Sequence, residues 1–473
     1  MKSADVSRRP RRAWLDDSAI ASRLAAAGPP SVVVAELTLL LITFLVFFLS
    51  PVLQVGDSRY SMLLSENIIR YHSTHLNRYT FPGPVEELDR SVPPTNADAR
   101  NTRTYQLGRV KGNVVYLFPN GSSILSLPFI AAASWLGWNF FPPGGAYDEH
   151  AEVGIEKILA AILMAVLTFV IFRTGLHMLG TAESVVIAVG AAFGTQIWST
   201  TSRAMWSHTW LILLEAVVIL DLLRCEEDET GLHPILLATL LSWMYFVRPT
   251  AAVVIACLTV YVILFHRRDF LLYAATGGLW FVGFVGYAQI TFGEFLPGYF
   301  SASRLEFRNF ATALQGVLIS PSRGLFIFVP IAVFVIYRVA RYWRALPHRR
   351  LAALALITFV LQILTAAGFP KWWGGWSYGP RLLSDAVPWL VLLAILGQKA
   401  AASEAISLRG RLELAAAAVL LALSIWINGR GALSWATGTW NAAVDIDHHP
   451  ERAFDWSRPQ FLAGLIDDHR AAR

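Results

Sequence analysis

The residues best placed for chemistry follow the first long apolar stretch of the sequence. Residues 31–50 are almost uninterrupted Val, Leu, Ile and Phe, and Asp57 and Arg59 come shortly after them. A run of about 20 apolar residues spans a bilayer as a helix, so Asp57 is expected just beyond the hydrocarbon. Ionisable groups at such depths are expensive and commonly functional. Asp57 is therefore a candidate general base; the alternative is an interfacial acid that merely ends the helix.

Basic and aromatic residues further along the chain would complete a site for a phosphate-bearing sugar substrate. Arginine forks pair bidentately with phosphate, and Asp57 could then deprotonate an incoming hydroxyl. The candidates for phosphate binding are Arg203, Arg248, Arg323, Lys371 and Arg381. The candidates for acceptor or sugar binding are Arg59, Glu66, Trp372, Trp373 and Trp376.

These residue types also have structural interpretations. Tryptophans gather at membrane interfaces, and single arginines snorkel to the surface. Arg381 and Asp385 are four residues apart, so a simple helix ion pair is expected between them. Cys225 and Cys257 show no CxxC or His/Cys metal spacing. The residues therefore predict no metal site, no cofactor and no structural disulfide.

The composition predicts an all-α polytopic membrane protein. The chain of 473 residues is 55% hydrophobic and only 15% charged, whereas a soluble domain is about 25% charged. The net charge of +6 fits basic cytoplasmic loops and contacts with anionic lipid or phosphate. The basic residues are scattered between apolar spans, which makes nucleic acid a poor partner.

The basic loops predict a topology of eleven spans. Arg8, Arg9, Arg11 and Arg12 place the N-terminus in the cytoplasm, and later basic clusters mark the other cytoplasmic loops. The expected spans are residues 31–50, 155–173, 182–199, 206–223, 233–247, 249–266, 270–290, 323–340, 350–369, 380–398 and 412–428. The chain is expected on the outer side both before and after residues 114–141, so this segment crosses the membrane an even number of times. It is too short to cross twice. It is expected to form a re-entrant or interfacial segment; the alternative is a second span that violates one charge rule.

The chain thus divides into three expected parts. Residues 1–30 form a basic cytoplasmic segment, residues 31–428 form the transmembrane domain, and residues 429–473 form an extracytoplasmic tail. The first extracytoplasmic loop, residues 51–154, is expected to carry interfacial helices, one of them over Ser58 to Tyr71. The candidate polar residues gather on the outer side, which favours a reaction at the membrane surface.

Four short motifs, in their order along the chain, resemble the GT-C superfamily of membrane glycosyltransferases. The resemblance is greatest to the branch that holds the protein O-mannosyltransferases and the lipid A aminoarabinose transferases, and it covers roughly residues 31–428. The motifs are Gly56-Asp57-Ser58-Arg59-Tyr60, Phe118-Pro119-Asn120-Gly121 with Leu127-Pro128-Phe129, Arg248-Pro249-Thr250, and Trp373-Gly374-Gly375-Trp376 with Gly379-Pro380-Arg381.

The resemblance implies a fold and a reaction. It implies that Asp57 is the catalytic base, that residues 114–141 lie along the outer surface, and that a polyprenyl-phosphate sugar is the donor, with inversion at the anomeric carbon. Many members carry two adjacent acids at the first-loop position, whereas Ser58 follows Asp57 here. A divalent metal or a second-acid role in acceptor binding therefore stays open, with Glu66 as the nearest candidate.

The sequence is interpreted as a multi-pass glycosyltransferase of the plasma (inner) membrane with its active site on the extracytoplasmic face. It would pass a sugar from a polyprenyl-phosphate lipid to a hydroxyl of a glycan, lipid or protein acceptor. One alternative is a lipid-linked saccharide transporter or flippase, although only Glu215 lies near a span centre and the two halves do not match. The other is a non-enzymatic membrane assembly subunit, in which Asp57 would be dispensable.

Overall fold

The computed structural model describes residues 30–87, 104–138, 145–227, 231–402 and 407–466, which are mostly helical and contain a single two-stranded sheet. Six helices in these ranges are long and apolar enough to cross a membrane. They are Ser31–Leu49, Glu149–Leu176, Phe270–Thr291, Arg349–Ala367, Arg381–Ala401 and Leu408–Leu433. The expectation of an all-α integral membrane protein is confirmed. The expected segment 1–30 lies, apart from Pro30, outside the described residues.

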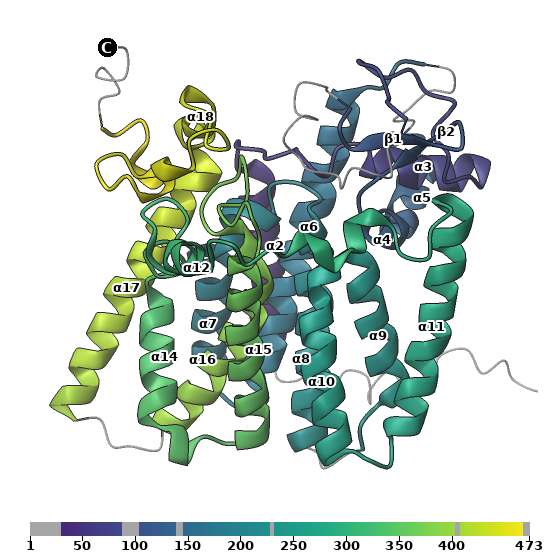
Figure 1. The fold of residues 1–473 in the computed structure, drawn as a ribbon. Helices are drawn as coiled ribbons and strands as arrows, with labels where there is room; N and C mark the ends of the chain where they lie inside the picture. The colour runs from purple at the N-terminus through teal and green to yellow at the C-terminus, as the bar shows by residue number, and fades with distance from the viewer. Residues whose placement is uncertain (1–29, 88–103, 139–144, 228–230, 403–406, 467–473) are drawn as a thin grey trace, which may run out of the picture.

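The long helices stand side by side as a bundle (Figure 1). They are α2 (Pro30–Leu49), α6 (Glu149–Leu176), α7 (Thr181–Gly194), α8 (Ser207–Glu227), α9 (Pro234–Val247), α10 (Ala252–Phe265), α11 (Phe270–Thr291), α14 (Ile331–Arg341), α15 (Arg349–Ala367), α16 (Val387–Ala401) and α17 (Leu408–Leu433). Each of the eleven expected spans overlaps one of these helices. Five of them do not combine the length and the apolar composition of a membrane span, so the count of eleven stays a prediction.

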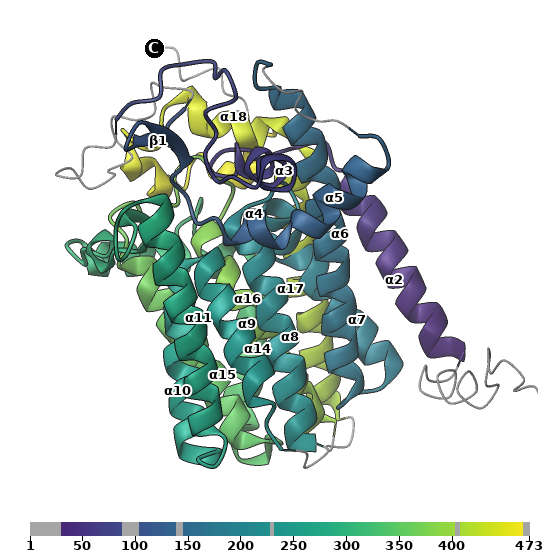
Figure 2. The same cartoon turned by 90° about the vertical axis from the view of Figure 1, so that its right-hand side faces the viewer.

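Shorter elements cover one end of the bundle, which we call the capped end (Figures 1 and 2). They are α3 (Ser61–Tyr71), β1 (Leu107–Val110), β2 (Asn113–Tyr116), α4 (Gly121–Leu125), α5 (Leu127–Trp135) and α18 (Trp435–Ala443). β1 and β2 pair in antiparallel register, with Leu107 opposite Tyr116. Lys111 and Gly112 both have positive φ, as the two central residues of a tight type I′ hairpin turn require.

Further short elements lie between the bundle helices, and the last two of them follow α17. They are η2 (Ile197–Thr201), η3 (Pro249–Ala251), η4 (Gly298–Phe300), η5 (Ala302–Arg304), α12 (Phe310–Ile319), α13 (Leu325–Phe328), η6 (Trp343–Ala345), η7 (Arg381–Ala386), η8 (Pro450–Phe454) and η9 (Gln460–Leu462). The expected tail from residue 429 begins inside a helix, because α17 continues to Leu433. The described part of the tail packs over the capped end (Figure 1).

Residues 114–141, expected as one apolar segment, divide into different elements. Val114 belongs to strand β2, and α4 and α5 have only 5 and 9 residues. A helix that crosses a bilayer needs about 20 residues, so neither crosses it alone. Pro128 lies in the first turn of α5, where the N–H that proline lacks would have no helical partner.

Gly121 brings the start of α4 against the end of α9. A Cβ atom at Gly121 would lie 2.5 Å from the backbone carbon of Phe246 and 2.5 Å from the backbone nitrogen of Val247. Backbone atoms cannot move aside as the end of a flexible side chain can. The absence of a side chain at this position therefore sets how closely the capped end approaches α9.

Replacing Gly121 by Ala should lower the melting temperature of the purified protein in detergent. Overpacking of a tight contact costs about 1–3 kcal/mol. The matched control is Gly278→Ala in α11, where a Cβ would meet nothing within 4 Å, and it should be neutral or slightly stabilising. Equal melting temperatures for the Gly121→Ala variant and the wild type would contradict this account of the contact.

Candidate functional site

Asp57 lies at the capped end, between α2 and α3, where three other segments contact it. Its Oδ1 accepts a hydrogen bond from the Tyr105 hydroxyl at 3.0 Å, and its Oδ2 accepts one from Arg381 Nη1 at 3.0 Å. The Tyr116 hydroxyl donates to its backbone carbonyl at 2.7 Å. Burial, together with the charge of Asp57, holds the pKa of Tyr105 well above its ordinary value. Tyr105 therefore stays protonated and donates to the carboxylate.

Arg381 is the cation of this site. It begins η7, and its guanidinium carbon lies 4.2 Å from the centre of the Trp206 ring. A cation over an indole face is held by the ring quadrupole. Arg381 Nε is buried and has no hydrogen-bond partner among the described residues. Arg381 thus neutralises Asp57 and keeps one donor that an anion could use.

The expected helix pair between Arg381 and Asp385 is wrong. The segment that carries both is a 3₁₀ helix, which has three residues per turn, so residues four apart do not share a face. Asp385 instead accepts from Arg248 Nε at 2.8 Å and lies 2.5 Å from His208 Nδ1. Arg381 pairs with Asp57, which is 324 positions away in the sequence.

Arg248 reaches the same region through Ser207. Its Nη1 donates to Ser207 Oγ at 3.0 Å, and Ser207 and Asp57 line one small polar pocket. Of the five expected phosphate ligands, Arg381 thus contacts Asp57 directly, and Arg248 contacts Ser207, which lines the same pocket as Asp57.

Arg203 is fully buried, and its guanidinium forms hydrogen bonds within the protein. It donates to the carbonyls of Phe47 and Ser50 at the end of α2 and to Ser202 Oγ. The last carbonyls of a helix have no partner within that helix, so Arg203 caps α2. It does not line the pocket of Asp57.

Arg323 is also fully buried, and its guanidinium also forms hydrogen bonds within the protein. It donates to the Trp373 carbonyl at 2.7 Å and to Asn441 Oδ1 at 2.8 Å, and it also bonds Gln460 Oε1. These contacts tie the loop between α15 and η7 (residues 368–380), which we call the tryptophan-rich loop, to the C-terminal segment after α17 (residues 434–466). Arg203 and Arg323 thus both have structural roles within the fold, and the expected phosphate contact of each stays a prediction.

The three expected sugar-stacking tryptophans lie away from the Asp57 pocket. Trp372 is buried against Gly316 of α12, and Trp373 Nε1 donates to Asp447 Oδ1 at 2.7 Å. Trp376 is 52% exposed, and its Nε1 donates to Asp445. None of the three lines the pocket around Asp57. The indole N–H groups of Trp373 and Trp376 anchor the loop to the C-terminal segment.

The remaining candidates also have structural partners or lie apart from the pocket. Arg59 forms an ion pair with Glu149, and Glu66 is fully buried with Arg70 Nε 2.6 Å away. Lys371 is partly buried in the tryptophan-rich loop. Arg59, Glu66 and Lys371 are absent from the pocket lining.

Two cavities meet at Phe118. The small polar pocket holds about 20 Å³, and the larger apolar groove holds about 230 Å³. The polar pocket is lined by Asp57, Ser58, Ser61, Tyr116, Phe118, Pro119, Ser122, Met205, Ser207 and Tyr299. The groove is lined by Leu117, Phe118, Asn120, Gly121, Ile124, Trp243, Phe246, Trp280, Gly283, Phe284, Tyr287, Phe292, Pro297 and Phe300. The groove has room for an apolar chain, and the polar pocket that adjoins it at Phe118 has room for about one water molecule.

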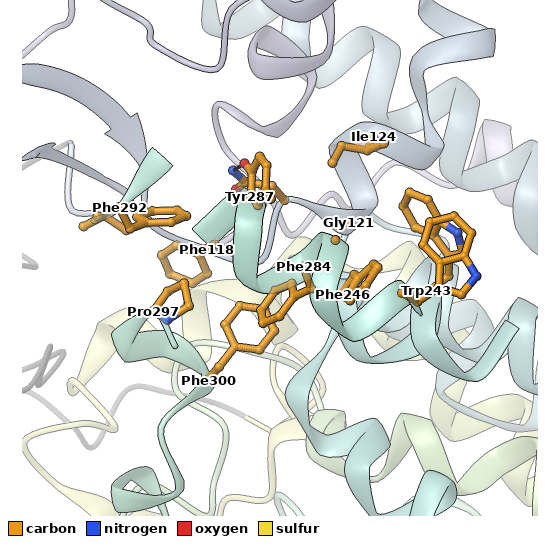
Figure 3. Close-up of a pocket in the computed structure, with 14 residues that line it drawn as sticks. Phe118, Gly121, Ile124, Trp243, Phe246, Phe284, Tyr287, Phe292, Pro297 and Phe300 are labelled. Atoms are coloured by element: carbon orange, nitrogen blue, oxygen red, sulfur yellow. Dashed lines mark hydrogen bonds between the residues drawn. The ribbon is translucent and has the colours of Figure 1, made fainter. Parts of the chain in front are cut away.

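The groove is built largely from aromatic side chains of α9 and α11 (Figure 3). The rings of Phe246 and Phe284 stack with centroids 5.0 Å apart. The amide of Asn120, directly before α4, donates to the Tyr287 hydroxyl. The Asn120-Gly121 pair thus fixes α4 to both helices of the groove, which is a structural role for this motif.

Glu152 holds the turn that carries Asp57, a role that no local sequence pattern predicts. It is fully buried in α6 and accepts hydrogen bonds from the backbone N–H groups of Tyr60, Met62 and Leu63 at 2.7, 2.9 and 3.1 Å. These donors lie at the start of α3, where helix N–H groups have no partner within the helix. A carboxylate is favourable there because of the helix dipole.

Glu156 adds a second attachment one helical turn along α6. It accepts from Ser58 Oγ at 2.8 Å and from the backbone N–H of Met205 at 3.2 Å. Tyr60 has φ +71°, a conformation that costs a residue other than glycine about 1–3 kcal/mol. Contacts on both sides of Tyr60 are what allow the chain to hold this conformation.

Tyr105, Tyr116, Trp206 and Glu152 were not among the expected site residues. Tyr105 lies just before β1 and Tyr116 ends β2, so the hairpin brings both hydroxyls to Asp57. No local spacing connects them to a residue more than 45 positions earlier.

No protein-family model matches this chain, and no curated protein matches it either.

Replacing Glu152 by Ala should destabilise the protein and loosen the start of α3. Three buried N–H groups would lose their acceptor, and an unsatisfied buried donor costs about 1–3 kcal/mol. Thermal unfolding and hydrogen exchange at Met62 and Leu63 would measure this effect.

The matched control is Glu149→Ala, one turn earlier on α6. Glu149 is 47% exposed and pairs only with Arg59 among the contacts described above, and such surface pairs contribute about 0–1 kcal/mol. Equal exchange rates at Met62 and Leu63 in the two variants would contradict the assigned role of Glu152.

Proposed function

We propose that this chain is an inverting glycosyltransferase of the GT-C type. It moves a sugar from a polyprenyl-phosphate lipid to a hydroxyl of an extracytoplasmic glycan, lipid or protein acceptor. One observation carries the proposal: an apolar groove and an acid-bearing polar pocket share the ring of Phe118. A polyprenyl-phosphate sugar has the same division into an apolar chain and a charged, polar head.

The two cavities would divide the donor between them. The prenyl chain lies in the groove among the aromatic rings of α9 and α11, where burial of apolar surface stabilises it by about 25 cal/mol for each Å². The phosphate lies near Arg381, whose Nε is buried without a partner among the described residues. Arg248, held by Asp385 and Ser207, supplies the second positive charge.

Asp57 takes the proton of the acceptor hydroxyl. The acceptor oxygen forms the new bond to the anomeric carbon as the bond from that carbon to the phosphate oxygen breaks. The electron pair of the broken bond leaves with the lipid phosphate, and the positively charged side chains Arg381 and Arg248 stabilise this negative charge. The attack and the departure occur on opposite faces of the sugar, which inverts the anomeric centre.

The ion pair between Asp57 and Arg381 couples donor binding to this proton transfer. In the structure, Arg381 Nη1 donates to Asp57 Oδ2 at 3.0 Å. A phosphate competes for the same guanidinium and thereby frees one carboxylate oxygen for the acceptor hydroxyl. The Tyr105 hydroxyl keeps the other oxygen in place.

We also propose that all eleven bundle helices cross the plasma (inner) membrane and that the capped end is extracytoplasmic. The support is the distribution of basic residues. Arg224, Arg267, Arg341, Arg349 and Lys399 lie at helix ends or turns opposite the capped end. Lys and Arg are enriched in cytoplasmic loops.

Replacing Asp57 by Asn should lower turnover by about 10²–10⁴, the usual contribution of a general base. The assay offers polyprenyl-phosphate sugars in the outer leaflet of proteoliposomes and measures glycosylated product. Asn keeps the shape and one acceptor oxygen, so the melting temperature should change little.

Glu149→Gln is the control, because it removes a half-exposed carboxylate whose partner among the described residues is Arg59. Near-wild-type turnover of folded Asp57→Asn protein would contradict the proposed mechanism. Transport of labelled lipid across the bilayer without product would instead favour a flippase.

Gly283→Leu should raise the Michaelis constant for long-chain donors and leave short-chain donors unaffected. Gly283 lines the groove, and a Cβ there would meet nothing within 4 Å, so the leucine should project into the space proposed for the lipid chain. Gly286→Leu is the control, since Gly286 is equally open but does not line the groove. Equal donor dependence in both variants would place the lipid chain elsewhere.

A further inference from the structure

We propose that Asp221, Cys225 and His233 bind a divalent transition-metal ion of the Zn²⁺ type at the end of the bundle opposite the capped end. Their ligand atoms, one oxygen, one sulfur and one nitrogen, all lie within 4.8 Å of one another. The site is independent of the glycosyl-transfer proposal, because it lies at the other end of α8 from His208 and the cluster of Asp385.

The fold places the three side chains together from two helices. Asp221 and Cys225 are four residues apart on α8 and therefore lie on the same face. His233 directly precedes α9, and its Nδ1 is 2.9 Å from Asp221 Oδ1 and 3.9 Å from Cys225 Sγ. Neighbouring ligands of a tetrahedral zinc ion are separated by about 3–4 Å, given metal–ligand distances of about 2.0–2.3 Å.

The donor set selects the class of metal. A thiolate and an imidazole favour zinc and related transition metals, whereas Mg²⁺ and Ca²⁺ prefer oxygen ligands. Cys225 is buried, while the His233 side chain is 56% exposed, so an ion can enter from solution. The Cys225 thiol now donates weakly to the Gly231 carbonyl at 3.5 Å, and its proton would leave when the metal binds.

The metal would hold the two helices together at a second point. At the capped end, α8 and α9 already meet through His208 and Arg248, which share Asp385. A metal at Asp221, Cys225 and His233 would fix the opposite ends of the same helices. It would thereby restrain α9, which lines the apolar groove and ends at Arg248.

Cobalt and zinc binding to the purified, metal-stripped full-length protein in detergent would test the site. We expect one equivalent of Co²⁺ with a thiolate-to-cobalt charge-transfer band, displacement of cobalt by Zn²⁺, and a melting temperature that rises with either ion. Cys225→Ser should abolish the band, and His233→Gln should weaken binding at least tenfold. Cys257→Ser is the matched control, because Cys257 is the other buried cysteine and lies in α10.

Variants are compared by their melting temperatures without metal, which separates loss of binding from loss of fold. Asp221→Asn provides a further variant that keeps the shape of the side chain. The proposal is overturned if the wild type binds no stoichiometric cobalt, or if the charge-transfer band survives in Cys225→Ser and disappears in Cys257→Ser.

Discussion

The ion pair between Asp57 and Arg381 is the interaction on which the rest of the site depends. It joins the segment after the first apolar helix to the start of η7, in the last fifth of the chain. The surrounding contacts keep both partners in place: Tyr105 holds the carboxylate, and the Trp206 ring lies under the guanidinium. Glu152 fixes the backbone just beyond Asp57. A carboxylate and a cation fixed in this way can exchange their contact with each other for contacts with a bound ligand.

The second constraint is that the polar pocket and the apolar groove meet. Gly121 lets α4 approach the end of α9, and Asn120 bonds Tyr287 of α11. Phe118, two residues earlier, therefore lies where the groove ends and the pocket of Asp57 begins. The same short motif thus shapes both cavities, and this shared wall is what the proposed lipid-linked donor requires.

Local sequence patterns predicted the helical membrane fold, and they placed Asp57 after the first long helix and Arg381 among the candidate phosphate ligands. They did not predict which arginines turn toward the pocket. Arg203 and Arg323 are drawn to backbone carbonyls that only the folded chain brings to them. The same limit explains the error at Asp385, because the helix type after Pro380 decides whether residues four apart face each other. Tyr105 and Glu152 act through long-range contacts that leave no spacing to find.

The most direct test of the central claim is the affinity of the protein for a polyprenyl phosphate that carries no sugar. A phosphate contact to a charged donor contributes about 1.5–3 kcal/mol, so Arg381→Ala should weaken binding by about 10- to 150-fold. Arg381→Lys should restore only part of it, because lysine lacks the planar fork. Asp57→Asn should bind as tightly as the wild type or more tightly, since it no longer competes for Arg381. Unchanged affinity in Arg381→Ala, or weaker binding in Asp57→Asn, would contradict the account.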